Sequence, residues 1–271
     1  MTDREVIITS TRNRRVVDAR KLDQRKHRQR QGRFLVEGLQ LLHMALDAGA
    51  RPVEVFFCEA LFAGPEAPTL LDRFQQTEAN LVATSAYILE ALSERDTPQG
   101  LVATFELFEA RIDTIALQGD DLVVVLDRLQ DPGNMGTIMR TADAVGAAAV
   151  ALIEPCVDPF DPKTVRGSMG SLFNVPLVRT EDVERLFGWL RGSGLQVTGA
   201  DAHRGVPWGE GLWQGGLALI LGNEARGLSD DVEAYVEARV QLPIVGQAES
   251  LNVAVAGGVL MYTWLREKWK V

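Results

Sequence analysis

Two unbroken apolar runs constrain the fold of this chain more than any other feature. Residues 122–127 read LVVVLD, and residues 217–222 read LALILG. A strand with one solvated face alternates apolar and polar residues, whereas a continuous apolar run is typical of a parallel strand covered on both faces. Strand-like and helix-like segments alternate around both runs, with helices predicted at 131–146 and 181–190. The pattern therefore predicts an α/β domain with a parallel sheet.

The N-terminal part of the chain shows the same alternation on a smaller scale. Strands are predicted at 53–60 and 100–107, and a helix at 69–79. The segment 34–50 has apolar residues three or four apart, which predicts a helix that ends at Gly49. The expected division of the chain is a small α/β domain, a polar linker and the larger parallel-sheet domain, at 1–107, 108–119 and 120–271.

The formal net charge of −9 hides a strong asymmetry along the chain. Residues 1–33, called the basic segment below, contain 11 Lys or Arg and 4 Asp or Glu, whereas the rest contains 17 and 33. Most of this segment is predicted to be helical, because Arg, Lys, Gln and Leu are good helix formers. Two interpretations stay open at this point. The segment either follows a nucleic-acid backbone with its positive face or is a solvated helix that binds nothing.

Several common kinds of site are missing from the sequence. There is no GxxxxGK[ST] phosphate loop, no GxGxxG after a strand, no GxSxG turn and no CxxC pair. Cys58 and Cys156 stand alone, so neither a disulfide scaffold nor a metal site is expected. No apolar run approaches the roughly 20 residues of a membrane helix, and the N-terminus lacks a signal-peptide core. We therefore expect a cytoplasmic protein without a membrane partner.

Polar residues follow both apolar runs. After the first run, residues 131–134 read DPGN, a turn sequence, and the next helix presents Arg140. The second run ends at Gly222 and leads into the sequence GNEARGL. Polar groups that follow parallel strands lie where open α/β sheets bind ligands. DPGN by itself is more often a simple turn, so neither segment alone identifies a site.

A third segment, 242–265, contains the apolar sequence LNVAVAGGVLMY. Ser250 is predicted to be the N-cap of a closing helix. That helix is apolar almost all round, which predicts complete burial in a core or at a subunit interface. Gly257 and Gly258 in its interior indicate close approach of another backbone. Asn252 is harder to explain by packing, because Asn is a poor residue within an apolar helix.

These three segments, in this order, resemble the SpoU-type (TrmH) RNA 2′-O-ribose methyltransferases of the SPOUT superfamily. Between the first two lies PFDPKTVRGSMGSLFNVPL, residues 159–177, which looks like that family's K-x-x-R-x-S-x-G segment. Nearer the N-terminus, RFLVEGLQLLHMAL is similar to the family's small substrate-binding domain, which is related to ribosomal RNA-binding proteins. Ala225-Arg226 departs from the smaller pair that often follows GNE in this family.

The resemblance implies features that composition and periodicity do not show. It implies an α/β fold in which the C-terminal parallel-sheet SPOUT domain forms a deep trefoil knot, binds S-adenosylmethionine in that knot and makes a homodimer. The small N-terminal α/β domain is expected to bind RNA. By the same resemblance, the cofactor-binding residues are Thr198, Gly199, Ala200, Leu221, Gly222, Asn223, Glu224, Gly227, Ile244, Ser250 and Leu251.

The implied reaction is methyl transfer to a ribose 2′-hydroxyl of RNA. The resemblance places Arg140 at the centre of the site, with the other catalytic residues Asn134, Glu224, Ser250 and Asn252 around it. A guanidinium is essentially never deprotonated in proteins, so we expect Arg140 to hold a substrate phosphate and not to act itself as the base. The expected RNA contacts are Arg12, Arg14, Arg15, Arg25, Lys163 and Arg166.

The additional N-terminal domain favours ribosomal RNA of the large subunit, 23S rRNA, over tRNA as the substrate. Two alternatives stay open. One is a tRNA ribose 2′-O-methyltransferase. The other is a non-catalytic RNA-binding or assembly protein on the same fold, against which the intact set of expected catalytic residues argues.

Overall fold

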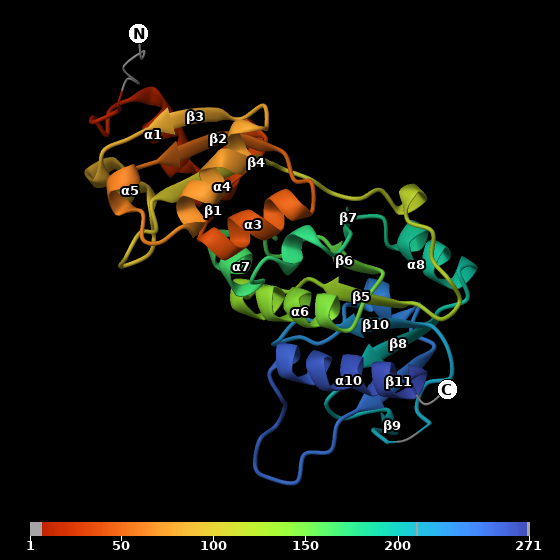
Figure 1. Ribbon diagram of the computed structural model, residues 1–271. Helices are drawn as coiled ribbons and strands as arrows, with labels where there is room; N and C mark the ends of the chain where they lie inside the picture. Colours follow the sequence, from red (N-terminus) through yellow and green to blue (C-terminus); the bar gives the residue numbers. More distant parts are fainter. Residues whose placement is uncertain (1–6, 210, 270–271) are drawn as a thin grey trace. The chain divides into compact units, whose positions relative to one another are not determined.

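The computed structural model describes residues 7–209 and 211–269 (Figure 1). The chain forms two compact units, Met1–Leu107 with Phe160–Phe173, and Phe108–Pro159 with Asn174–Val271. The predicted division differs, because it left 160–173 in the second domain. The aromatic rings explain the difference, since Phe160 and Phe173 lie 4.7 and 6.1 Å from the ring of Phe34 in the first unit. Residues 1–6, 210 and 270–271 of the predicted domains lie outside the described residues.

The first unit is built on a four-stranded sheet in the order β1-β4-β2-β3. β4 runs antiparallel to β1 and β2, and β2 runs parallel to β3. Helices and short 3-10 turns connect and cover the strands. The strands are β1 (Arg33–Glu37), β2 (Pro52–Phe57), β3 (Asn80–Ala83) and β4 (Leu101–Glu106), and the helices are α1 (Arg14–Arg20), α2 (Arg25–Gln31), α3 (Leu39–Asp47), α4 (Glu66–Gln75), α5 (Ala86–Leu92) and α7 (Pro162–Gly167).

The predicted helix at 34–50 is wrong in its first part. Residues up to Glu37 form β1, which pairs with β4, and α3 begins only at Leu39. Gly38 between them has φ +105°, a conformation that L side chains rarely adopt. Apolar residues that match a helical spacing therefore belong to a strand here, because the pairing with β4 outweighs the local pattern.

The basic segment is not one helix. It forms α1 and α2, separated by a 3-10 turn at Lys21–Asp23. Val16 and Leu22 are buried, so this region packs on the unit through one apolar face. Arg28 is only 2 % exposed and donates hydrogen bonds to the carbonyl oxygens of Leu22 and Asp23 at 2.7 and 2.8 Å. One of the eleven basic residues is thus structural, which the charge count did not predict.

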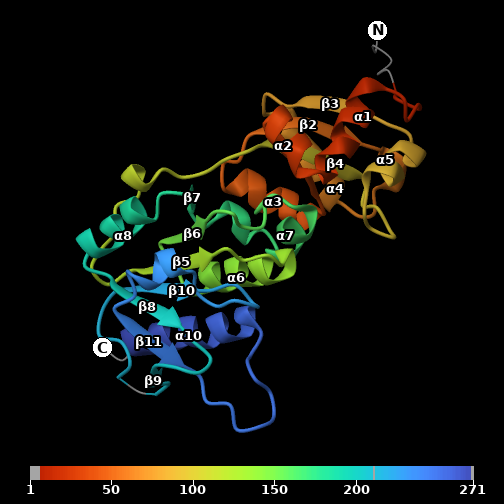
Figure 2. The same cartoon turned by 180° about the vertical axis from the view of Figure 1, so that it is seen from behind.

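The second unit contains a seven-stranded sheet in the order β7-β6-β5-β10-β8-β11-β9, and every recorded pairing is parallel (Figure 2). The two apolar runs are the adjacent central strands β5 and β10, fully buried as predicted. The parallel α/β sheet is therefore confirmed. Its strands are β5 (Leu122–Asp127), β6 (Ala149–Ile153), β7 (Leu177–Thr180), β8 (Gln196–Ala200), β9 (Val206–Pro207), β10 (Leu217–Leu221) and β11 (Ala238–Gln241), with helices α6 (Pro132–Ala144), α8 (Val183–Gly192), α9 (Asp230–Glu233) and α10 (Val253–Lys268).

The closing helix α10 differs from its prediction in two ways. Of the two predicted settings, burial in the core of this chain is wrong, because Val255, Val259 and Tyr262 are 54 %, 39 % and 52 % exposed, whereas burial at a subunit interface stays a prediction. The close approach at Gly257 is to a side chain and not to a backbone, since a Cβ there would lie 2.6 Å from Cδ1 of Leu221. A helix that looks apolar all round thus has one covered face and one open face. No helix in the described part of the chain is long and apolar enough to cross a membrane.

Candidate active site

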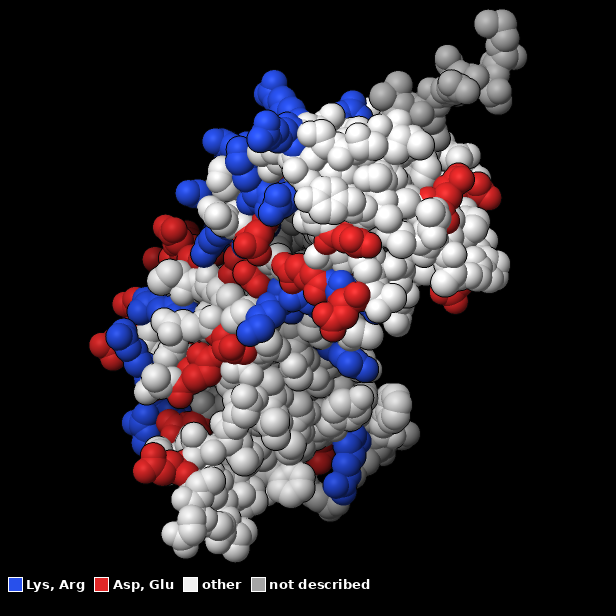
Figure 3. All heavy atoms as spheres, turned by 90° about the vertical axis from the view of Figure 1, so that its left-hand side faces the viewer, with Lys and Arg blue, Asp and Glu red and all other residues white. Residues whose placement is uncertain are grey.

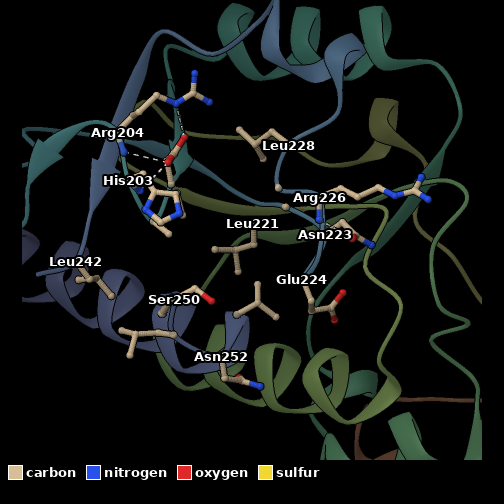
Figure 4. Close-up of a pocket in the computed structure, with 18 of the residues that line it drawn as sticks. His203, Arg204, Leu221, Asn223, Glu224, Arg226, Leu228, Leu242, Ser250 and Asn252 are labelled. Carbon is tan, nitrogen blue, oxygen red and sulfur yellow. Dashed lines mark hydrogen bonds and ion pairs between the residues drawn. The ribbon is translucent and has the colours of Figure 1, made fainter. Parts of the chain in front are cut away.

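A cavity of about 660 Å³ opens where three neighbouring parallel strands end (Figure 4). Its walls come from the segments that follow β8, β10 and β11 and from the start of α10. Carboxyl ends of parallel strands lie at one edge of a sheet, which is where open α/β folds bind ligands. The sequence argument from polar residues after 217–221 therefore predicted the correct edge.

Most of the predicted cofactor-binding residues meet in this cavity. Those that line it are Ala200, Leu221, Gly222, Asn223, Glu224, Gly227, Ile244, Ser250 and Leu251. Thr198 and Gly199 lie in the buried part of β8 and are not among the lining residues that the structure describes. Gly199 lies behind the lining, because a Cβ there would lie 2.7 Å from Cδ1 of Leu228, which does line the cavity.

Sequence reasoning missed one wall of the cavity, the segment Asp201–Arg204 after β8. Asp201 accepts hydrogen bonds from the backbone N–H groups of His203 and Arg204 at 2.9 and 3.0 Å, which holds this turn in place. Burial by itself would raise the pKa of Asp201, but those hydrogen bonds and the charge of Arg204 outweigh it and lower the pKa. A signal was present in the sequence, because Asp201 is a polar residue at the end of β8, much as Asn223 lies just after β10.

The loop at residues 222–229, called the 222–229 loop below, is closed tightly on itself. Asn223 and Gly227 exchange backbone hydrogen bonds at 2.9 Å, and the Asn223 side chain accepts from the N–H groups of Ala225 and Arg226. Gly222 leaves no room for a side chain, since a Cβ would lie 2.5 Å from the carbonyl carbon of Gly227. The glycines therefore let two backbone segments approach each other beside the cavity.

Two side-chain contacts fasten the 222–229 loop to the end of β5. Asp127 is fully buried and accepts from the N–H and hydroxyl of Ser229 at 2.6 and 3.1 Å. Asn223 donates through Nδ2 to the carbonyl oxygen of Arg128 at 2.9 Å. Arg128 has φ +56°, which is uncommon for a residue other than Gly, and it pairs with Asp231 at 2.7 Å. These anchors were not predicted, although a carboxylate at the end of an apolar strand was a visible signal.

Three of the predicted catalytic residues form a continuous chain of side-chain contacts. Asn134 donates through Nδ2 to the carboxylate of Glu224 at 3.1 Å, and its Oδ1 accepts from Nδ2 of Asn252 at 2.9 Å. Glu224 also accepts from the backbone N–H groups of Gln130 and Asp131 at the start of α6. The chain joins the beginnings of α6 and α10 to the 222–229 loop, and we call it the Glu224–Asn134–Asn252 chain.

Asn252, and not Ser250, is the N-cap of α10. Its Oδ1 accepts from the N–H groups of Ala254 and Val255 at 2.9 and 3.2 Å. The predicted cap at Ser250 is therefore wrong. Asn252 is also explained, because it lies at the end of the helix, where Asn is favoured, and not in its apolar interior. Ser250 is exposed and lines the cavity (Figure 4).

Arg140 is not among the described residues that line the cavity. It lies on the exposed side of α6, and it has no ion pair among the described residues. Met135, Ile138 and Met139 form the buried side of the same helix. The arrangement leaves the guanidinium free for a ligand outside the cavity wall.

The predicted RNA contacts all lie in the first unit. Lys and Arg side chains gather over α1 and α2 (Figure 3). Arg14 is 95 % exposed at its side chain, whereas Arg15 is in an ion pair with the buried Glu54 at 3.5 Å. Lys163 is exposed on α7, and Arg166 pairs with Glu94. The remaining predicted contacts are Arg12, which is exposed, and Arg25, which is half-buried.

The electrostatic effect of this basic surface is visible at His27. Partial desolvation and the charges of Arg30, Lys26 and Lys21 lower the pKa of His27 below its usual value. Its Nδ1 lies 3.1 Å from the guanidinium of Arg30. Desolvation and the neighbouring cations thus both disfavour the protonated form of His27.

Known protein families match both the N-terminal and the C-terminal part of the chain. The SpoU rRNA Methylase family model matches residues 121–262, and the MRM3-like substrate binding domain model matches residues 13–103. The 23S rRNA (guanosine(2553)-2′-O)-methyltransferase RlmP of Bacillus subtilis is 33% identical over 94% of this chain and 97% of its own. The 23S rRNA (uridine(2479)-2′-O)-methyltransferase of Streptomyces viridochromogenes is 32% identical over 91% of this chain and 87% of its own.

Solved structures give the same result. An rRNA methyltransferase from Sinorhizobium meliloti with bound AdoMet has a TM-score of 0.87 and 33% identity, covering 97% of this chain and 98% of its own. The SpoU methyltransferase AviRb from Streptomyces viridochromogenes, also with AdoMet, has a TM-score of 0.85 and 30% identity over 95% and 98% of the two chains. The family predicted from the sequence motifs is therefore confirmed, and this chain belongs to the SpoU rRNA methylase family.

Proposed function

We propose that this protein is an S-adenosylmethionine-dependent methyltransferase that modifies a ribose 2′-hydroxyl of 23S rRNA in the cytoplasm. The observation that carries the proposal is the Glu224–Asn134–Asn252 chain at the cavity, where carboxylate and amide groups stand beside a ligand-sized pocket. Relatives that match both units are named as 23S rRNA methyltransferases. A structure concerned with tRNA methylation covers only 56% of this chain, which favours ribosomal RNA.

The cavity fits the proposed cofactor in size and in chemistry. About 660 Å³ is in the range of cavities that hold drug-sized ligands. Leu221, Leu242 and Leu251 supply apolar surface, and the 222–229 loop, in which Gly222 lets the chain pack closely against Gly227, lines one side of the cavity. When bound, S-adenosylmethionine supplies a methyl group on a sulfonium, a good leaving group, so the enzyme mainly has to align the reactants.

The chain's own residues then have distinct tasks. Glu224 and Asn134 hold the start of α6 against the 222–229 loop, and Asn252 holds the start of α10 in the same arrangement. This fixes the rim of the cavity at which a ribose would enter. Ser250 presents a hydroxyl to the cavity. Arg140 binds a phosphate of the substrate, and an oxygen of that phosphate can relay the proton of the 2′-hydroxyl, which a guanidinium itself would not accept.

Two further features of the family belong to this proposal. A trefoil knot in the second unit is included because the family model that matches residues 121–262 is that of the SpoU methylases, for which we expect this knot. A homodimer is supported by α10, because Val255, Val259 and Tyr262 leave an apolar stripe exposed in one chain. Val259→Asp should give a monomer by light scattering, whereas an unchanged dimer would place the interface elsewhere.

Methyl transfer tests the proposed function directly. Purified protein with tritiated S-adenosylmethionine is offered unmodified 23S rRNA and, separately, bulk tRNA. We expect label on 23S rRNA at a nucleotide whose 3′-phosphodiester bond resists alkaline cleavage. The Arg140→Ala variant should lose this label but still bind the cofactor in calorimetry. Label on tRNA alone would favour the tRNA enzyme. Absence of cofactor binding by the wild-type protein would favour a non-catalytic RNA-binding protein.

A further inference from the structure

The cavity rim is predominantly acidic. Asp201, Glu224, Glu233 and Glu249 contribute carboxylates, and the cationic lining residues are Arg204 and Arg226. An RNA strand that brings a ribose to this rim also brings phosphates on both sides of that ribose, which the carboxylates of Glu224 and Glu249 repel. Arg140 is proposed above to bind one of these phosphates, so the phosphate on the other side of the ribose calls for a second cation.

Arg204 is not available for that task. Its Nε lies 3.2 Å from a carboxylate oxygen of Asp201, and its Nη2 lies 3.6 Å from Glu233. Arg239 on β11 pairs with the same Glu233, so these side chains form a closed cluster. Arg204 is therefore committed to holding the wall of the cavity.

Arg226 differs from Arg204 in having no such commitment. Among the described residues its guanidinium has no hydrogen bond and no ion pair, and the residue is exposed. Arg226 is one of the residues that line the cavity, and in Figure 4 its side chain extends away from Leu221 and Ser250. This orientation favours a ligand at the edge of the cavity over one held between Leu221 and Ser250.

The base of this side chain is held rigidly. The N–H of Arg226 donates to Oδ1 of Asn223 at 3.1 Å, within the turn closed by Asn223 and Gly227. The contact of Ser229 with the buried Asp127 fastens the far end of the same loop to β5. Binding a ligand through the guanidinium then has to order only one side chain and no backbone, which lowers the entropic cost.

We propose that Arg226 binds a phosphate of the RNA substrate beside the target ribose. A guanidinium suits this task, because its planar donors match two phosphate oxygens. The inference rests on the proposed function, since it concerns the same site. It also assigns the 222–229 loop two ligands, with its backbone facing the cofactor cavity and its Arg226 side chain facing the RNA.

Two substitutions in the same loop should therefore have opposite signatures. Arg226→Ala should raise the KM for unmodified 23S rRNA roughly tenfold, as for loss of one charge-assisted hydrogen-bonded contact. The slope of log affinity against log salt should fall by about 0.7, the value for one phosphate contact on single-stranded RNA. Cofactor affinity in calorimetry should not change. Ser229→Ala, which loosens the anchor to Asp127, should instead weaken cofactor binding.

Arg185→Ala is the matched control, because it removes the same charge from the same unit. Arg185 lies on α8, outside the cavity lining, and is held by both carboxylate oxygens of Asp113. It should leave both affinities unchanged, and Arg226→Lys should restore part of the RNA affinity and the salt slope.

Two results would overturn the inference. One is unchanged RNA affinity and salt slope in Arg226→Ala. The other is a loss of cofactor affinity in that variant with RNA binding intact, which would make Arg226 a cofactor contact. Failure of the proposed function is distinguishable, because the wild-type protein would then bind no S-adenosylmethionine or label no RNA.

Discussion

The 222–229 loop of the second unit and the basic segment of the first hold their functional groups in different ways. The loop is fastened by the fully buried Asp127 and closed by reciprocal backbone hydrogen bonds. On α1, by contrast, Arg14 is almost fully exposed and has only a 3.6 Å ion pair with Asp18. Reaction geometry has to be exact to fractions of an ångström, whereas attraction of a long polyanion does not. This difference fits the proposal that methyl transfer takes place at the anchored loop and that the exposed segment contributes affinity for RNA.

The largest effect is expected from a side chain at Gly222, because it would prevent the 222–229 loop from closing as it does. Gly222→Ala would place a Cβ 2.5 Å from the carbonyl carbon of Gly227, so backbone must shift. We expect overpacking of about 3 kcal/mol and a loss of cofactor affinity on the order of 100-fold, measured by calorimetry. Gly188→Ala on α8 is the control, because a Cβ there meets nothing within 4 Å. It should stabilise the protein by roughly 0.5–1 kcal/mol and leave cofactor affinity unchanged.

Neutralising the basic segment tests the other side of the comparison. The combined substitution of Arg12, Arg14, Arg15 and Arg25 by Gln should weaken 23S rRNA binding roughly tenfold and flatten its salt dependence, with cofactor affinity unchanged. The contribution of Arg15 should be the smallest of the four, because it is already paired with Glu54. Filter binding over a salt series measures both quantities. Unchanged RNA binding would mean that the segment is a solvated helix pair and nothing more.

Asn252 allows its structural and functional contacts to be separated. Asn252→Ser keeps a capping oxygen at the start of α10 but does not reach Asn134, so we expect a severalfold lower kcat with the melting temperature unchanged. Asn252→Ala removes both contacts and should also lower the free energy of unfolding by about 1 kcal/mol. If both variants lose stability and activity in parallel, Asn252 is a cap without a role in the Glu224–Asn134–Asn252 chain.

The smallest expected effect is a shift in the pKa of His27. Desolvation and the neighbouring cations Arg30, Lys26 and Lys21 lower this pKa in the free protein, because they disfavour the protonated ring. Bound phosphate offsets that charge, so the pKa should rise on RNA binding, and binding should tighten as the pH falls below neutrality. Titration of the His27 ring signals by NMR, with and without RNA, measures the shift. An identical pKa in both states would place the RNA away from α2.

Much of the fold could be read from local patterns. The continuous apolar runs predicted β5 and β10, and polar residues after the second run predicted the edge at which the cavity opens. The pattern failed at 34–50, where pairing with β4 made a strand of the first residues. It also failed at the cap of α10, because Ser250 and Asn252 are both good capping residues and only the helix start distinguishes them.

What the sequence determined by itself was the class of sheet, the sequence motifs and the family, because each depends on residue types at short spacing. The tertiary structure alone decided which motif residues touch. It brought Asn134, Glu224 and Asn252 together, left Arg140 outside the cavity, and placed residues 160–173 in the first unit. Contacts between residues about a hundred positions apart, such as Asp127 with Ser229, depend on the path of the whole chain. Such contacts leave no local periodicity in the sequence, so the anchoring of the site became visible only in the folded molecule.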